Sequence, residues 1–222
     1  MPTHVALLRG INVGRQSRIA MSDLREVVSS VGHDDVATYI QSGNVVFSTP
    51  QTDTKRLAAD LERAIVESLG VGPKVIVVSR DELADVVATN PFPEETDPKF
   101  LHAVFHGEEL SPAALADVAA AQRRAADKGS RDESRVVGRT LFLRTPGGIG
   151  RSELAAQLAR TDTAKAGEAG TARNWATVTK LLSLVEGQRL LPAGEQDPLE
   201  PAAVTSGRIA DRTGNVHEHR RR

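Results

Sequence analysis

The stretch VATYIQSGNVVFS, residues 36–48, predicts a β-hairpin in the first third of the chain. Val36–Gln41 and Asn44–Ser48 are short and rich in β-branched residues, and only Ser42-Gly43 lies between them. A two-residue connection that contains Gly is typical of tight hairpins, because Gly adopts positive φ without strain. The pattern therefore places two antiparallel strands side by side, and the elements on either side of them decide the fold.

On both sides of this hairpin in the sequence, the neighbouring segment is predicted to be a helix and the next one a strand. Met21–Val31 and Thr54–Leu69 have apolar residues at helical spacing, and Ser22 is a candidate N-cap of the first helix. Val5–Leu8 and Lys74–Ser79 are nearly continuous apolar runs that predict buried strands. The order β-α-β-β-α-β is the ferredoxin-like arrangement.

A weaker copy of this order follows a helix and a proline-rich connector. Its predicted elements are a strand, a helix capped by Ser111, a hairpin and two helices, at residues 100–105, 111–126, 135–144, 152–160 and 173–185. No closing strand is evident in the pattern. We predict an α+β protein with a first ferredoxin-like half at 1–80, a helix and connector at 81–98, a second ferredoxin-like half at 99–186 and a tail at 187–222. The tail lacks apolar periodicity and is expected to be disordered.

Composition excludes several classes of protein. The chain has no cysteine, so disulfides, thiolate catalysis, iron–sulfur clusters and cysteine zinc sites are excluded. The amino terminus shows no signal peptide, and no apolar run approaches the roughly 20 residues that span a bilayer. A formal net charge of −1 gives the molecule as a whole no electrostatic attraction to membranes or nucleic acid. We therefore expect a cytoplasmic protein without a membrane partner.

Three polar islands carry the residue types from which turns and ligand sites are made. They combine Gly, Asn and Arg with strand or helix formers, and they are LRGINVG (residues 8–14), QSGNVVF (residues 41–47) and TARNWATVTKL (residues 171–181). Such combinations serve specific turns or ligand-facing surfaces equally well.

In this order the islands resemble the bacterial family named domain of unknown function 1697. The resemblance includes Thr38–Phe47, Asn90-Pro91-Phe92 and Lys99–His102, and it extends from about His4 to Glu186. It implies two ferredoxin-like halves and implies no established activity. Two positions differ from the pattern of the family: Ala176 stands where a second Asn is usual, and Glu153 stands where Lys is usual. An anion-binding role of either position in the family would not carry over to this chain.

Arg9, Asn12 and Gly14 are candidates for holding an anion. They follow the predicted first strand, and free backbone N–H groups in a Gly turn can bind phosphate or carboxylate together with arginine. The alternative is a loop in which Gly permits positive φ and Asn closes a turn. The spacing does not fit a phosphate-binding loop of the NTPase type.

Arg173 and Asn174 are the corresponding candidates in the third island. They could project beside Arg9 and form one site for an anionic ligand. Basic residues outnumber acidic ones from Arg139 to Leu181, which fits an anion-facing surface and a solvated surface equally well. The alternative is that Asn174 caps a helix whose apolar stripe, beginning at Trp175, belongs to the core.

Other candidates have simpler explanations. The glycine turn Pro146–Ser152 fits a turn with Ser152 as N-cap. His102 and His106 lie on or beside a predicted strand, where a spacing of four residues separates them by roughly 13 Å, too far for one metal ion. The predicted strands at 5–8 and 75–78 carry no aromatic residue, so the sheet offers no platform for stacking RNA bases.

The leading functional hypothesis is a binding module for a small anionic ligand, a nucleotide or a phosphorylated metabolite. Its predicted site residues are Arg9, Asn12, Gly14, Arg173 and Asn174, with no metal and no cofactor. The alternatives are a cofactor-free enzyme that uses the same cleft, and a module that binds proteins or, weakly, nucleic acid. No side chain has an evident acid–base or nucleophilic role, so the sequence leaves open whether the protein is an enzyme, and it leaves the oligomeric state open as well.

Overall fold

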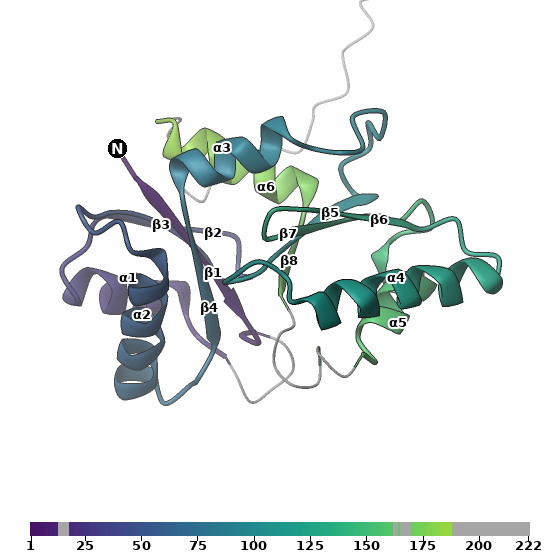
Figure 1. Ribbon diagram of the computed structural model, residues 1–222. Coiled ribbons are helices and arrows are strands. Elements are labelled where there is room, and N and C mark those ends of the chain that lie inside the picture. Colours follow the sequence, from purple (N-terminus) through teal and green to yellow (C-terminus); the bar gives the residue numbers. More distant parts are fainter. Residues whose placement is uncertain (13–17, 162–163, 165–169, 188–222) are drawn as a thin grey trace, which may run out of the picture. The chain divides into compact units, whose positions relative to one another are not determined.

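The computed structural model of the chain describes residues 1–12, 18–161, 164 and 170–187 (Figure 1). It shows a mixed α+β protein with two four-stranded antiparallel sheets and helices packed against them. The predicted fold class is confirmed. The predicted tail from Gly187 onward lies, apart from Gly187 itself, outside the described residues.

The first sheet has the strand order β2-β3-β1-β4, with every neighbouring pair antiparallel. Two helices, α1 and α2, alternate with these strands in the expected β-α-β-β-α-β order and cover one face of the sheet (Figure 1). The elements are β1 (His4–Arg9), α1 (Met21–Ser30), β2 (Asp34–Tyr39), β3 (Asn44–Ser48), α2 (Thr54–Leu69) and β4 (Lys74–Ser79).

The predicted two-residue hairpin is a four-residue loop instead. Tyr39 pairs directly with Asn44, so Ile40–Gly43 form the connection, and Ile40 and Gly43 both have positive φ (47° and 74°). The Asn44 amide closes the loop from inside by donating to Tyr39 O at 3.1 Å and to Ser42 Oγ at 2.9 Å. These bonds take Ile40 and Gln41 out of the strand that the β-branched pattern had predicted for them.

The start of α1 also differs from the prediction. The helix begins at Met21 with Ala20 in the N-cap position, and no side chain caps it. Ser22 is therefore not the N-cap, and its hydroxyl donates to Asp23 at 3.0 Å. In contrast, α2 has the predicted bounds, with Asp53 accepting hydrogen bonds from two backbone N–H groups of its first turn.

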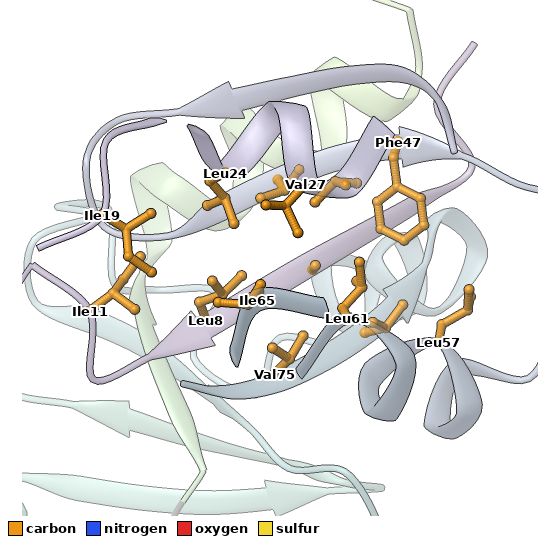
Figure 2. Close-up of a cluster of buried hydrophobic side chains, with 14 residues drawn as sticks. Leu8, Ile11, Ile19, Leu24, Val27, Phe47, Leu57, Leu61, Ile65 and Val75 are labelled. Carbon is orange, nitrogen blue, oxygen red and sulfur yellow. The ribbon is translucent and has the colours of Figure 1, made fainter. Parts of the chain in front are cut away.

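The covered face of the first sheet holds a continuous hydrophobic cluster (Figure 2). Strand residues such as Leu8, Phe47 and Val75 meet Leu24 of α1 and Leu61 of α2 there. The opposite face is buried as well, and its side chains include Val5, Leu7, Ile76 and Val78. Because side chains alternate along a strand, burial of both faces explains why β1 and β4 read as continuous apolar runs.

Two further helices pack together and against this region. The helices α3 (Arg80–Ala88) and α6 (Trp175–Val185) lie side by side, and α6 also contacts β1 and β3. Although α6 belongs to the end of the described chain, it thus packs on the first sheet, and this joins the two halves of the chain in one compact unit.

The second sheet repeats the arrangement of the first, with the strand order β6-β7-β5-β8 and all pairs antiparallel. The helices α4 and α5 pack on one of its faces (Figure 1). The elements are β5 (Leu101–Phe105), α4 (Pro112–Asp127), β6 (Glu133–Val137), β7 (Thr140–Arg144), α5 (Glu153–Leu158) and β8 (Thr171–Asn174).

The closing strand β8 corrects the sequence interpretation, which began the last helix at Arg173. Thr171–Asn174 pair with β5, from Thr171 opposite Phe105 to Asn174 opposite His102, and α6 begins only at Trp175. Within β8, buried and exposed residues alternate strictly. Four residues carry too little periodicity to distinguish a strand from a helix, so this strand is specified by its pairing with β5.

Candidate functional site

The three polar islands meet at the tip of the β2–β3 hairpin. The backbone N–H of Leu8 donates to Gly43 O at 2.8 Å, which joins the first island to the second. The third island reaches the same place through Arg173, whose Nη2 donates to Leu8 O at 2.8 Å and to Ser42 O at 3.0 Å. The structure therefore brings together residues that lie 165 positions apart in sequence.

Arg173 is almost completely buried, with 9% of its surface exposed. Each of its three guanidinium nitrogens donates to a protein oxygen: Nε to Asn44 Oδ1, Nη1 to Ala172 O at 2.9 Å, and Nη2 to backbone carbonyls of the hairpin and of β1. Burial lowers the pKa of Arg173 to about 10, so the side chain remains charged at neutral pH. The charge is satisfied by carbonyl and amide oxygens, and the guanidinium links β8 to β1 and the hairpin.

Gly43 makes this close approach possible. A Cβ at this position would lie 2.7 Å from Ile11 Cδ1 and 2.8 Å from Leu8 Cβ, and the residue has a φ of 74°. Any side chain here would therefore collide with the first island and strain the backbone.

Asn12 and Asn174 also use their side chains within the protein. Asn12 Nδ2 donates to Gln41 O at 2.9 Å and to Ile19 O at 3.2 Å, while its Oδ1 accepts from Ile19 N at 3.0 Å. Asn174 Oδ1 accepts from Thr177 N at 2.8 Å and thereby caps α6, the role that the sequence offered as its alternative. Gly14 lies outside the described residues.

Arg9 stands at the carboxyl end of β1, directly opposite Lys74 of β4. Both side chains face away from the cluster of Figure 2, because the adjacent Leu8 and Val75 belong to that cluster and strand side chains alternate. Cross-strand neighbours have Cβ atoms about 5 Å apart, so two cationic groups share this end of the sheet.

Beside this pair lies a cleft of about 470 Å³ between β4 and the segment that leads from β5 into α4. We call it the junction cleft, and its walls include Lys74, Ile76, His106, Ser111, Gly170 and Thr171. Ser111 caps the N-terminus of α4 by accepting from Ala114 N at 3.1 Å.

Thr171 gives the junction cleft an unsatisfied polar group. The residue is 1% exposed, and its Oγ1 is one of the few buried side-chain atoms of the described residues that have no hydrogen-bond partner. Buried hydroxyls almost always have a partner, so Thr171 is an exception among the residues that the structure describes.

The charges around the junction cleft are of both signs. Lys74 Nζ lies 3.5 Å from Glu62 Oε2, and Lys55 pairs with Glu108 at 2.6 Å across the rim. This pairing lowers the pKa of Glu108. Lys74 thus contributes a cationic group to the lining of the cleft, with Arg9 as its cross-strand neighbour, and Glu109 contributes an exposed acid.

Sequence reasoning missed Lys74, Thr171 and Asn44. Lys74 is the first residue of a strand, and the sequence around it gives no sign that it lies near Arg9. The two residues are neighbours because of the register in which β1 and β4 pair. Asn44 stood inside the second island, and its complete burial next to Arg173 shows that it is part of the structural junction.

The remaining candidates have structural roles. Ser152 caps α5 by accepting from Ala155 N at 2.9 Å, as its position after the glycine turn predicted. His102 is buried within β5, which lowers its pKa, and His106 lies just beyond that strand. Within the residues that the structure describes, no helix is long and apolar enough to cross a membrane.

Comparison with known proteins agrees with this architecture of two α+β halves. The solved structure of the conserved bacterial protein SP0830 from Streptococcus pneumoniae superimposes with a TM-score of 0.63 and 20% sequence identity, over 84% of this chain and 99% of that one. At this identity the likeness shows the fold alone. The model of the family described as a protein of unknown function (DUF1697) matches residues 1–142, and the chain belongs to that family. No curated protein sequence matches it significantly.

Proposed function

We propose that the protein is a binding module for a small anionic ligand, a nucleotide or a phosphorylated metabolite, and that the anionic group of the ligand binds in the junction cleft. The observation that carries this proposal is that the cleft is lined both by Lys74, whose cross-strand neighbour is Arg9, and by Thr171, whose buried hydroxyl has no hydrogen-bond partner. Cationic donors and a hydroxyl are the groups with which proteins hold phosphate.

In this proposal Arg9 retains the anion-binding role that the sequence predicted for it. Arg173, Asn12 and Asn174 receive a structural role instead. Arg173, Asn12 and Asn174 direct their hydrogen bonds to protein atoms, which supports a role in holding the walls of the cleft in place. Arg173 and Thr171 follow each other on the same face of β8, so the buried guanidinium fixes the strand that presents the hydroxyl.

The size of the cleft supports a small ligand. Its volume of about 470 Å³ lies within the range of ligand pockets, roughly 300–1,000 Å³. The N-terminus of the 16-residue helix α4 borders the same space, and its dipole adds to the attraction for negative charge.

Titration calorimetry with pyrophosphate and adenosine monophosphate tests the proposal. We expect both compounds to bind the wild type, and we expect the double variant Arg9→Gln, Lys74→Gln to bind them at least about tenfold more weakly, since charge-assisted hydrogen bonds are lost. The matched control is Arg123→Gln, Arg160→Gln, which removes the same charge from two exposed positions. The proposal is wrong if neither anion binds the wild type, or if the two double variants bind equally.

A further inference from the structure

A second space adjoins the junction cleft and is lined by apolar side chains. It has a volume of about 320 Å³ and lies between the second sheet and the helices α4 and α5. We call it the apolar pocket, and the side chains around it include Val104, Leu110, Val118, Leu141, Leu143 and Leu158.

The pocket exists because the second half has smaller side chains and a shorter helix than the first half at equivalent places. The buried residues of α1 are Leu24, Val27 and Val28, whereas those of α4, which holds the same place in the order of elements, are Ala114, Ala121 and Ala125. The partner helix shortens from 16 residues in α2 to six in α5. Protein interiors are normally close-packed, so a space of this size beneath two helices is a feature to be explained.

The apolar pocket and the junction cleft share part of their walls. His106, Leu110, Ala114 and Gly170 line both spaces. At Gly170 a side chain is excluded, because a Cβ there would collide with Phe105 O and lie 2.8 Å from His106 Nε2. Gly170 therefore packs directly against Phe105 and His106, in the part of the wall that the two spaces share.

We infer that the ligand is an amphipathic anion, with its phosphate or carboxylate in the junction cleft and an aliphatic chain of medium length in the apolar pocket. This inference rests on the proposed function and names the chemical class of its ligand. The cleft is lined by Lys74, which has Arg9 as its cross-strand neighbour, and by Thr171, and these groups serve the head. The apolar pocket supplies aliphatic surface for the tail. Burial of the tail drives binding in proportion to the apolar area removed from water.

Calorimetric titration of the full chain with phosphate, butyl phosphate and octyl phosphate tests this inference. Each buried methylene strengthens binding about three- to fourfold, so octyl phosphate should bind about a hundredfold more tightly than butyl phosphate. Octanol, which has the tail without the anion, should bind far more weakly than octyl phosphate.

Variants that fill the apolar pocket provide the second readout. Ala172→Leu and Ala159→Leu place larger side chains at its margin, and both positions are exposed, so the fold tolerates them. We expect each to reduce the affinity for octyl phosphate to that for butyl phosphate and to leave phosphate binding unchanged. Ala176→Leu, at an exposed position of α6 outside the pocket, is the matched control and should change neither.

The outcomes separate the two proposals. If phosphate binds but octyl phosphate binds no better than butyl phosphate, the tail site is wrong and the anion-binding function stands. If octanol binds as tightly as octyl phosphate, the pocket takes neutral ligands, and both the amphipathic class and the anionic function are wrong. If none of the four compounds binds, both proposals fail.

Discussion

At the scale of single residues, Gly43 allows three distant segments of chain to come into contact. Leu8 and Ile11 pack where its side chain would be, while its carbonyl accepts hydrogen bonds from Leu8 N and from Arg173. The sequence pattern predicted a glycine with positive φ at a hairpin tip, and the φ of 74° confirms it. Its second role, the close approach of Leu8 and Ile11, depends on packing that no local pattern shows.

Substitution of Gly43 separates these two roles. We expect Gly43→Ala to lower the free energy of unfolding by about 3 kcal/mol, from backbone strain at positive φ and from the collision with Ile11 and Leu8. Gly138→Ala is the matched control, because Gly138 also has positive φ (53°) but no atom within 4 Å of the added Cβ, and it should cost only about 1 kcal/mol. Urea denaturation measures both values, and equal losses would show that crowding at Gly43 has no effect.

At the scale of elements, the junction between β8 and α6 organises both the cleft and the link between the halves. Thr171 and Arg173 point to the buried side of β8, Ala172 points to the apolar pocket, and Asn174 ends the strand and caps the helix that follows. Because no loop separates the strand from the helix, each residue of this segment has a fixed direction.

Asn174 should contribute to stability through its cap. We expect Asn174→Ala to lower the free energy of unfolding by about 1 kcal/mol, because Thr177 N loses its acceptor, and Asn174→Ser to retain most of the stability because serine is also a strong N-cap. Urea denaturation of the two variants measures the difference. If alanine and serine destabilise equally, the cap is not the reason for asparagine at this position.

At the scale of the whole molecule, two buried or half-buried arginines join the halves. Arg173 of the second sheet binds the hairpin and β1 of the first, and Arg139, in the turn between β6 and β7, donates to Val77 O at 3.3 Å and to Glu82 at 2.8 Å. The packing of α6 against α3 and β1 adds apolar contact between the halves. We therefore expect residues 1–187 to unfold as one cooperative unit.

Arg173→Lys tests this coupling. Lysine keeps the charge but lacks the planar fork of donors, so several buried acceptors lose their partner, and we expect the free energy of unfolding to fall by about 2–4 kcal/mol. Arg160→Lys, at an exposed position, is the matched control and should change stability by less than about 0.5 kcal/mol. Scanning calorimetry should show one transition for wild type and both variants; two separate transitions in the wild type would show that the halves unfold independently.

The sequence by itself determined the elements whose signals are local. The apolar periodicity of α2 specified its 16 residues, and the apolar runs of β1 and β4 predicted buried strands. The tertiary structure decided the rest: β8 is a strand because β5 pairs with it, and Arg173 lies among carbonyl oxygens because the hairpin meets it there. An arginine has the same local sequence whether it faces an anion or a carbonyl, and only the packing of residues far apart in the chain determines which partner it finds.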